Sequence, residues 1–272
     1  MTQLSRSGID VVVVTYNSAT YLPRLASSLR SIDEIRSVTI VDNDSKDDSA
    51  DIAERQDWGC SLSVLRSDSN PGFGKSMNLG ASHQSNPHDL ILILNPDVYL
   101  TEQVLKGLSR NLVEDPTLGT VGPVLTTPDG KAVSSARDFP TPKSIAMRYF
   151  VDAKHNARLT DVDWICGASM LWRREAFEQL NGFAEEFFLY FEDVDICRRA
   201  SSAGWGVAVN GSLTAVHDQG HGRKTSRFLR RQSRISRRRY AQKWFGHRGV
   251  LAALVADATD WAADIYHARQ GK

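Results

Sequence analysis

The sequence predicts an α/β fold in which a mostly parallel central sheet carries helices on both faces. The main observation is that continuous apolar runs alternate with segments whose apolar residues repeat at helical spacing. Such uninterrupted runs are typical of strands buried on both faces. Four of these strands are predicted in the first half of the chain, at 9–14, 37–41, 62–65 and 90–94.

Helices are predicted between these strands. The first covers about 22–29, a second begins near Ser49, a third follows the glycine turn at 70–78, and Thr101 caps a fourth. The second half of the chain is less regular. Strands are expected at 119–125, 164–172 and 205–209, helices at 175–180 and 193–203, and a loop over the site at 134–160.

Polar side chains follow each of the predicted parallel strands at its carboxyl end. In sheets of this kind, ligands bind beyond the carboxyl ends of the strands. The loops at the opposite edge of the sheet show no such cluster of polar residues. The edge at the carboxyl ends of the strands is therefore predicted to be a binding edge. Its polar residues are Tyr16, Asn17, Asp42, Asp44, Asn70, Asn95 and Asp97.

The stretch 187–199 is an aromatic run that stops at an acidic cluster. Aromatic residues favour burial and carboxylates favour water or a partner, so the junction is expected at the wall of a pocket. Glu192 and Asp193 lie at the start of a predicted helix, where the helix dipole favours an ionised carboxylate that can act as a base. The alternative reading is a helix cap with first-turn acids.

Composition narrows the protein class further. The 272 residues, 41% of them apolar, suffice for one main domain with an appendage. The N-terminus lacks the apolar segment of a signal peptide and no run of about 18 apolar residues occurs, so a cytoplasmic location is expected. Cys60, Cys166 and Cys197 lack metal-type spacing and are expected to be reduced.

Several enzyme classes do not fit the motifs. The glycine turn at 70–78 lacks the G-x-G-x-x-G form and follows the third strand, which argues against a nicotinamide enzyme. The Walker pattern is absent, and Tyr16-Asn17-Ser18 is not the glycine- and arginine-rich loop of a sugar nucleotidyltransferase. Acids at strand ends suit a divalent cation that holds a diphosphate, with Asp97 and His217 as ligands. The alternatives are an Asx-turn at Asp97 and a structural, hydrogen-bonded His217.

A set of motifs in a fixed order resembles family 2 glycosyltransferases, and more narrowly their rhamnosyltransferase-like branch. The resemblance spans about residues 9–220. The motifs are Thr15-Tyr16-Asn17, Val41-Asp42-Asn43-Asp44-Ser45, Asn70-Pro71-Gly72-Phe73-Gly74 with Asn78, Asn95-Pro96-Asp97-Val98, Gly167-Ala168-Ser169 with Arg173-Arg174, Gly182-Phe183, the stretch 187–195, and His217.

The resemblance implies a Rossmann-like GT-A fold and an inverting transfer from a nucleoside diphosphate sugar. Asp193 would be the general base and Glu192 would orient it. Asp97 and His217 would hold Mg²⁺ or Mn²⁺, and Asn95 stands where the family often has the first acid of Asp-x-Asp. The residues assigned to nucleotide-sugar binding are Thr15, Tyr16, Asn17, Asp42, Asp44, Asn70, Gly72, Asn78, Asn95 and Arg137, with Asp42 bonding the base.

The branch resemblance favours dTDP-rhamnose as donor, with a UDP-sugar as the alternative. The expected acceptor is a saccharide or a prenyl-linked saccharide of cell-wall or surface polysaccharide synthesis. Trp164 and Trp172 could stack on sugar or prenyl groups, although strand tryptophans more often belong to the core. The rival hypothesis is a catalytically silent module that binds a nucleotide sugar or scaffolds a membrane complex; the presence of Asp97, Asp193 and His217 favours the enzyme.

Charge is distributed unevenly along the chain. Residues 1–222 hold 20 Lys/Arg against 29 Asp/Glu, whereas 223–272 hold 13 against 3. We therefore predict a glycosyltransferase domain at 1–222 and a basic, helical extension at 223–272. The apolar residues of 228–245 are expected to bind the anionic inner face of the cell membrane. A second amphipathic helix is predicted to follow at 250–266. A solvated tail is the alternative; nucleic acid, the rival partner, is not expected because the acidic main body would repel it.

Overall fold

The computed structural model describes residues 8–84, 86–154, 156–218 and 226–269, with only the backbone for 261–269. Ten strands of these residues form one sheet in the order β3-β2-β1-β4-β11-β6-β12-β5, with β7 beside β6 and β9 beside β12. Strands β8 and β10 form a separate pair. The strands are β1 Ile9–Thr15, β2 Ile35–Asp42, β3 Ser61–Arg66, β4 Leu90–Leu94, β5 Val98–Tyr99, β6 Leu118–Thr126, β7 Ala132–Val133, β8 Ala136–Arg137, β9 Leu159–Asp161, β10 Trp164–Ile165, β11 Ser169–Arg173 and β12 Gly206–His217.

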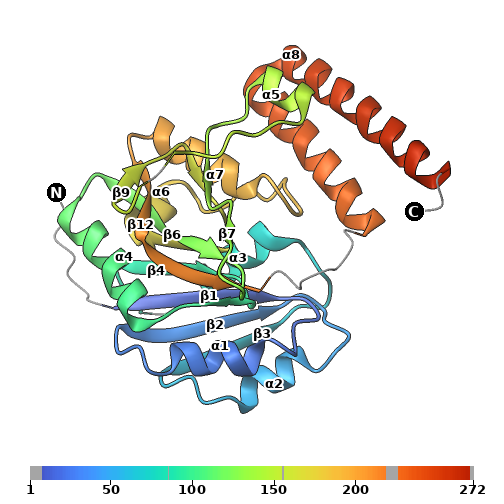
Figure 1. Ribbon diagram of the computed structural model, residues 1–272. Helices are drawn as coiled ribbons and strands as arrows, with labels where there is room; N and C mark the ends of the chain where they lie inside the picture. Colours follow the sequence, from blue (N-terminus) through green and yellow to red (C-terminus); the bar gives the residue numbers. More distant parts are fainter. Residues whose placement is uncertain (1–7, 85, 155, 219–225, 270–272) are drawn as a thin grey trace.

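The sheet is mostly parallel, as predicted. Strands β3, β2, β1 and β4 run parallel, β12 runs parallel to β6, and β11 is antiparallel to both of its neighbours. Helices cover both faces (Figure 1). They are α1 Leu22–Leu29, α2 Ser49–Arg55, α3 Phe73–Ser82, α4 Glu102–Glu114, α5 Pro142–Met147, α6 Arg174–Gln179, α7 Glu192–Ser202 and α8 Arg227–Arg269.

Two apolar cores lie on opposite sides of the sheet because side chains alternate along each strand. Val11 and Val13 of β1 pack with α1, α2 and α4, while Val12 and Val14 pack with α3, α6 and α7. The continuous apolar run of the first strand thus serves both layers. Thr101 caps α4 by accepting a hydrogen bond from the Val104 backbone N–H, as the sequence predicted.

The predicted strand at 164–172 is wrong in one respect, because two strands, β10 and β11, replace it. The chain leaves the extended conformation at Cys166-Gly167-Ala168. Here the Gly167 N–H donates to Oδ2 of Asp193 at 3.0 Å. A Cβ at Gly167 would lie 3.2 Å from the Asp193 Cβ, so the small residue lets the two segments approach closely. Trp172 is fully buried in the core, whereas Trp164 is half-buried.

Two further segments differ from expectation. The strand predicted at 205–209 continues to His217, with an irregular register between Asn210 and Thr214. The expected loop at 134–160 contains β8, α5 and β9, and α5 packs against α8. Thr141 starts α5 with a reciprocal capping box to Ser144, so the segment has local structure of its own.

The basic segment is helical, and part of the apolar set that was predicted to face a membrane packs inward, whereas Phe228 is exposed. Tyr240 is fully buried, and the Trp244 indole N–H donates to Oδ1 of Asp195 at 2.9 Å. Asp195, buried on α7, also binds Lys243 and Arg199. The sequence reading failed because Asp195 supplies a buried anion that attracts this face of α8 to the domain.

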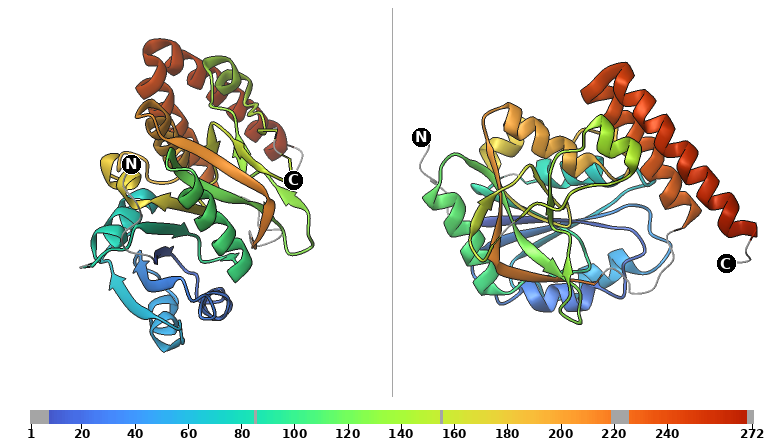
Figure 2. Two further views of the ribbon diagram at one scale, coloured as in Figure 1. Left: turned by 90° about the vertical axis from the view of Figure 1, so that its left-hand side faces the viewer. Right: turned by 45° about the horizontal axis from the view of Figure 1, so that its top comes forward.

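Helix α8 bends back on itself at Gly246, whose backbone (φ 56°, ψ −137°) is not helical. The two halves lie side by side on top of α7 (Figures 1 and 2). Arg237 joins them by ion pairs to Asp257 and Asp260, both at 2.5 Å. Leu251, Leu254 and Val255 of the second half are exposed. No helix in the described ranges combines the length and apolar character needed to cross a bilayer.

Candidate active site

A cavity of about 510 Å³ lies at the carboxyl ends of the parallel strands, where the sequence predicted a binding edge. Six of the predicted site residues line it: Tyr16, Asn17, Asn70, Gly72, Asn95 and Asp97. Asn43 lines it too and orders its wall, because its amide oxygen accepts from Ser76 Oγ at 2.6 Å. We refer to this cavity as the donor pocket.

Gly72 joins the donor pocket to the aromatic stretch at 187–191. It has φ +100°, and a Cβ at this position would lie 2.4 Å from the Phe188 carbonyl oxygen. The next residue, Phe73, donates its backbone N–H to the same oxygen at 2.9 Å. Only glycine therefore allows this close packing, which fixes Phe188 and Leu189 as one wall of the pocket.

Other predicted binding residues lie beside the donor pocket but do not line it. Asp42 is buried and accepts hydrogen bonds from the Thr15 hydroxyl and from both the N–H and the hydroxyl of Ser45. Asp44 forms an exposed ion pair with Lys46. These residues hold the loops after β1 and β2 together. The role of Asp42 in binding the base stays a prediction.

Asn78 has a different position from the one predicted. Its amide nitrogen donates to the Phe183 carbonyl at 2.8 Å and its amide oxygen accepts from the Phe183 N–H at the same distance. The residue lines another cavity, on the α3 and α6 side. Asn78 therefore braces α3 against the turn at Gly182, and the structure does not bring it to the donor pocket.

Asp97 and His217 come together although 120 positions separate them in the sequence. His217 ends β12 and pairs with Val98 of β5, which follows Asp97 directly. Its Nε2 lies 3.4 Å from Oδ1 of Asp97. Within the described ranges no group of three or more His, Cys, Asp or Glu side chains forms a metal site. The pair nevertheless fits a cation that completes its shell with diphosphate oxygens and water.

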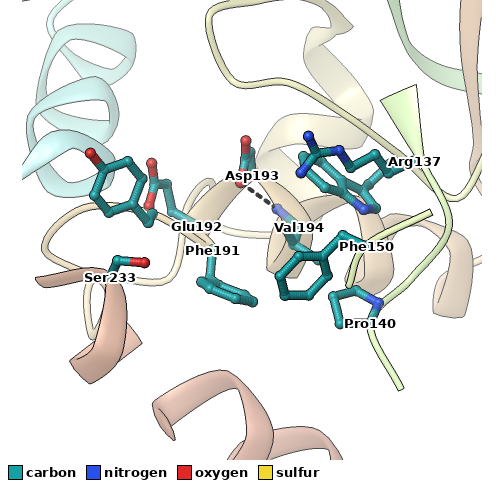
Figure 3. A pocket seen from close by; sticks show the side chains of 10 residues that line it. Arg137, Pro140, Phe150, Phe191, Glu192, Asp193, Val194 and Ser233 are labelled. Carbon is teal, nitrogen blue, oxygen red and sulfur yellow. Dashed lines mark hydrogen bonds between the residues drawn. The ribbon is translucent and has the colours of Figure 1, made fainter. Parts of the chain in front are cut away.

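A second cavity, of about 240 Å³, begins where the aromatic stretch ends. Ten residues line it: Arg137, Pro140, Phe150, Trp164, Tyr190, Phe191, Glu192, Asp193, Val194 and Ser233 (Figure 3). Asp193 and Glu192 are adjacent in it, with Arg137 on one side and Ser233 of α8 on the other. The structure thus places Arg137 in this cavity and not in the donor pocket. We refer to it as the base pocket.

The backbone before the two acids is strained. Tyr190 and Phe191 both have left-handed φ values, 71° and 67°. This conformation costs bulky residues about 1–3 kcal/mol each and persists where the surroundings enforce it. Here the surroundings include the Ser236 hydroxyl, which donates to the Leu189 carbonyl at 2.8 Å, and the buried ring of Phe187. The turn places Glu192 and Asp193 side by side at the start of α7.

The two carboxyls have different environments. Asp193 is partly exposed in the pocket and accepts from the N–H groups of Gly167 and Val194 at 3.0 and 2.8 Å. Desolvation raises its pKa, and these hydrogen bonds oppose the rise. Glu192 is buried, with one carboxyl oxygen lacking a partner among the described residues. Desolvation, followed by the charge of Asp193, raises the Glu192 pKa well above its usual range. Burial thus favours the neutral form more strongly for Glu192 than for Asp193.

Sequence reasoning missed the contribution of α8 to both cavities. Ser226, Phe228 and Leu229 line the donor pocket, and the ring of Phe228 packs edge-on against Phe188 at 5.9 Å. Ser233 lines the base pocket. The missing signal was Asp195, the third acid of the Glu192-Asp193-Val194-Asp195 motif, to which we had assigned no role. A buried acid two positions after the base predicts a basic partner elsewhere in the chain.

A mostly parallel sheet with a polar cavity at its strand ends, and an adjoining cavity that holds Glu192 and Asp193, is the architecture of a glycosyltransferase of the GT-A fold. The family model "Glycosyl transferase family 2" matches residues 10–181. The chain belongs to this family.

Curated relatives extend the likeness beyond the matched segment. An N-acetylglucosaminyl-diphospho-decaprenol L-rhamnosyltransferase of Mycobacterium tuberculosis (strain H37Rv) is 29% identical, covering 78% of this chain and 76% of the relative. Rhamnosyltransferase WbbL of Escherichia coli K12 is 25% identical, covering 78% and 84%.

Solved structures show the same fold at low identity. The mannosyltransferase PcManGT from Pyrobaculum calidifontis, in complex with GDP-Man and Mn²⁺, has a TM-score of 0.61 at 17% identity, covering 95% of this chain and 76% of that one. S. aureus TarS 1–349 in complex with UDP-GlcNAc has a TM-score of 0.58 at 18% identity, covering 84% and 65%.

Proposed function

We propose that this glycosyltransferase transfers rhamnose from dTDP-rhamnose to a hydroxyl of a saccharide that is linked through a diphosphate to a prenyl lipid. The rhamnosyltransferase relatives support the donor and acceptor classes. The observation that carries the proposal is the position of Asp193. It is a carboxylate with two backbone donors, at the wall of a cavity that adjoins the donor pocket through the 187–191 segment.

The reaction requires one base and inverts the anomeric carbon. Asp193 takes the proton of the acceptor hydroxyl, whose oxygen forms a bond to the anomeric carbon of the donor sugar. The bond from that carbon to the diphosphate breaks, and the nucleoside diphosphate leaves with the electron pair. Asp97 and His217 would hold the divalent cation, whose positive charge would stabilise the negative charge of the departing diphosphate. The raised pKa of Glu192 favours its neutral form, which adds no second negative charge beside the base.

A comparison of nucleotides tests the donor assignment. We expect dTDP to raise the midpoint of thermal unfolding more than UDP or GDP at equal concentration, because stabilisation grows with the logarithm of ligand concentration over Kd. The increase should require Mg²⁺ or Mn²⁺, and dTDP-rhamnose should be consumed when a short-chain prenyl diphosphate saccharide is present. Tighter binding of UDP than of dTDP would contradict the donor assignment.

Peripheral binding at the inner face of the cell membrane is part of the proposal, but the surface differs from the predicted one. Leu251, Leu254 and Val255 are exposed on one face of the second half of α8, and Arg248 is exposed just after the bend. Apolar contact and attraction to anionic lipid together support such binding.

Truncation near residue 222 is a poor test of membrane binding because it removes residues that line both cavities. Replacement of Leu251, Leu254 and Val255 by Ser leaves the cavities intact. The triple variant should lose sedimentation with phosphatidylglycerol vesicles while its dTDP affinity stays unchanged. Sedimentation equal to wild type would refute the proposal that this face of α8 binds the membrane.

A further inference from the structure

A third cavity, of about 330 Å³, adjoins the base pocket on the side of α8. It shares Phe150, Tyr190 and Ser233 with the base pocket, so the two form one continuous surface. Its other lining residues are Arg148, Leu229, Arg230, Arg234, Arg237 and Asp260. Four guanidinium groups and one carboxylate thus line a space beside the catalytic acids. We refer to it as the arginine pocket.

Three of the four arginines are held in place by ion pairs to Asp260. Asp260 binds Arg148 at 2.9 Å, Arg234 at 3.5 Å and Arg237 at 2.5 Å. Arg237 is 6% exposed, and its Nε donor has no hydrogen-bond partner among the described residues. Arg148 has a left-handed backbone (φ 54°) at the end of α5, a conformation that directs the chain back over α8. Asp257 also binds Arg237, at 2.5 Å, so two carboxylates serve a larger number of guanidinium groups. Holding this excess of cations together costs free energy, which an anionic ligand would offset.

The position of the pocket decides which anion it serves. The donor's diphosphate belongs with Asp97, which lines the donor pocket, and with His217 beside Asp97, on the far side of the 187–191 segment. A saccharide whose hydroxyl reaches Asp193 extends its remaining atoms along the base pocket toward Tyr190 and Ser233, where the arginine pocket begins. Planar guanidinium groups bind phosphate oxygens in pairs and suit a diphosphate better than a single charge.

We propose that the arginine pocket binds the diphosphate that joins the acceptor saccharide to its lipid. This inference rests on the proposed function, because it assumes an acceptor of that class. The arginines act by positioning: they hold the acceptor so that its hydroxyl lies at Asp193, and they take no part in proton transfer. A phospholipid headgroup offers similar chemistry, and the experiment below separates the two.

The matched pair of variants is Arg230→Glu and Arg231→Glu. Both residues are exposed arginines on the same turn of α8, but only Arg230 lines the arginine pocket. The probe is farnesyl diphosphate, measured by calorimetry in EDTA so that no cation can hold its diphosphate at Asp97 and His217. We expect Arg230→Glu to weaken binding at least tenfold and Arg231→Glu less than twofold, with farnesol as the uncharged reference.

Three outcomes would overturn the proposal. Equal weakening by both variants would show nonspecific attraction to the basic helix. Unchanged affinity in Arg230→Glu, with the same thermal midpoint as wild type, would exclude the pocket. Loss of phosphatidylglycerol vesicle binding in Arg230→Glu alone, with unchanged affinity for the probe, would assign the pocket to a membrane headgroup.

A kinetic measurement separates this inference from the proposed function. With a saccharide diphosphoprenol of short chain, Arg230→Glu should raise KM about tenfold and leave kcat within twofold. With the corresponding uncharged alkyl glycoside, both variants should match wild type. Absence of rhamnosyl transfer by wild type would refute the proposed function alone, since probe binding does not depend on turnover.

Discussion

The donor pocket and the base pocket are built in different ways, although one segment forms a wall of each. The donor pocket takes most of its residues from loops that follow consecutive parallel strands, within positions 14–97, and four asparagines line it. The base pocket combines five separate stretches, from Arg137 to Ser233, and half of its lining is aromatic or proline. A site made by strand ends is fixed by sheet topology, whereas a site made by distant segments depends on tertiary packing. The two pockets should therefore respond to different mutations.

The sharpest separation is expected for Asp193→Asn. The amide keeps the shape of the side chain but cannot accept a proton, so transfer should fall about 10³-fold. Donor affinity should stay within twofold, because Asp193 does not line the donor pocket. Rapid-quench measurement of product gives the transfer rate, and calorimetry with dTDP gives the donor affinity. Transfer within tenfold of wild type would remove Asp193 from the base role.

The reverse effect is expected for Asp97→Ala. Removing one of the two cation ligands should weaken metal-dependent binding of dTDP about 30-fold, and EDTA should weaken the wild type to the same level. Farnesyl diphosphate binding in EDTA should be unchanged, since the arginine pocket has no part in this site. If dTDP binds wild type equally with and without the cation, the protein is a metal-independent member of its family.

The packing of α8 should matter more for the base pocket than for the overall sheet. Trp244→Phe removes the indole donor of buried Asp195, which should lower the free energy of unfolding by about 1.5 kcal/mol. Leu251→Ser, on an exposed position of the same helix, is the control and should change it by less than about 0.5 kcal/mol. Urea unfolding measures both. An unchanged value for Trp244→Phe would show that this contact does not hold the helix.

The smallest expected effect concerns the proton on Glu192. Its folded pKa is raised, so the folded protein binds a proton that the unfolded chain, with a pKa near 4.5, has already released. Wild-type stability should therefore decrease as the pH rises from that value through the folded pKa. Glu192→Gln lacks this proton equilibrium, so its stability should decrease less between pH 5 and pH 8. An identical pH dependence in both proteins would show that Glu192 is ionised in the folded state.

The difference between the pockets also explains what could be predicted from the sequence. Alternating strands and helices located the edge that carries Asn17, Asn70 and Asp97, because the order of parallel strands places their ends together. The pairing of Asp97 with His217 was proposed from their chemistry as cation ligands and from the family resemblance, since nothing local in the sequence joins these positions. The approach of Gly167 to Asp193 was missed, because periodicity shows where a strand lies but not where a distant hydrogen bond interrupts it.

The charge of the C-terminal segment was read correctly, but its consequence was not. Counting cations identified a basic helix, yet Arg237, Arg238 and Lys243 bind acids of this same chain. Three acids placed at Asp195, Asp257 and Asp260 suffice to direct the helix inward. Net charge describes the whole segment, while the fold depends on which few charges are buried.

Helix α8 also sets the order in which a newly made chain gains its parts. Every strand of the sheet precedes residue 218, whereas Phe228, Leu229 and Ser233 complete the pockets later. At synthesis rates of 5–20 residues per second, about 1 to 3 s separate His217 from Ser233. The growing chain therefore has all the described strands of its sheet before Phe228, Leu229 and Ser233 can complete the two pockets.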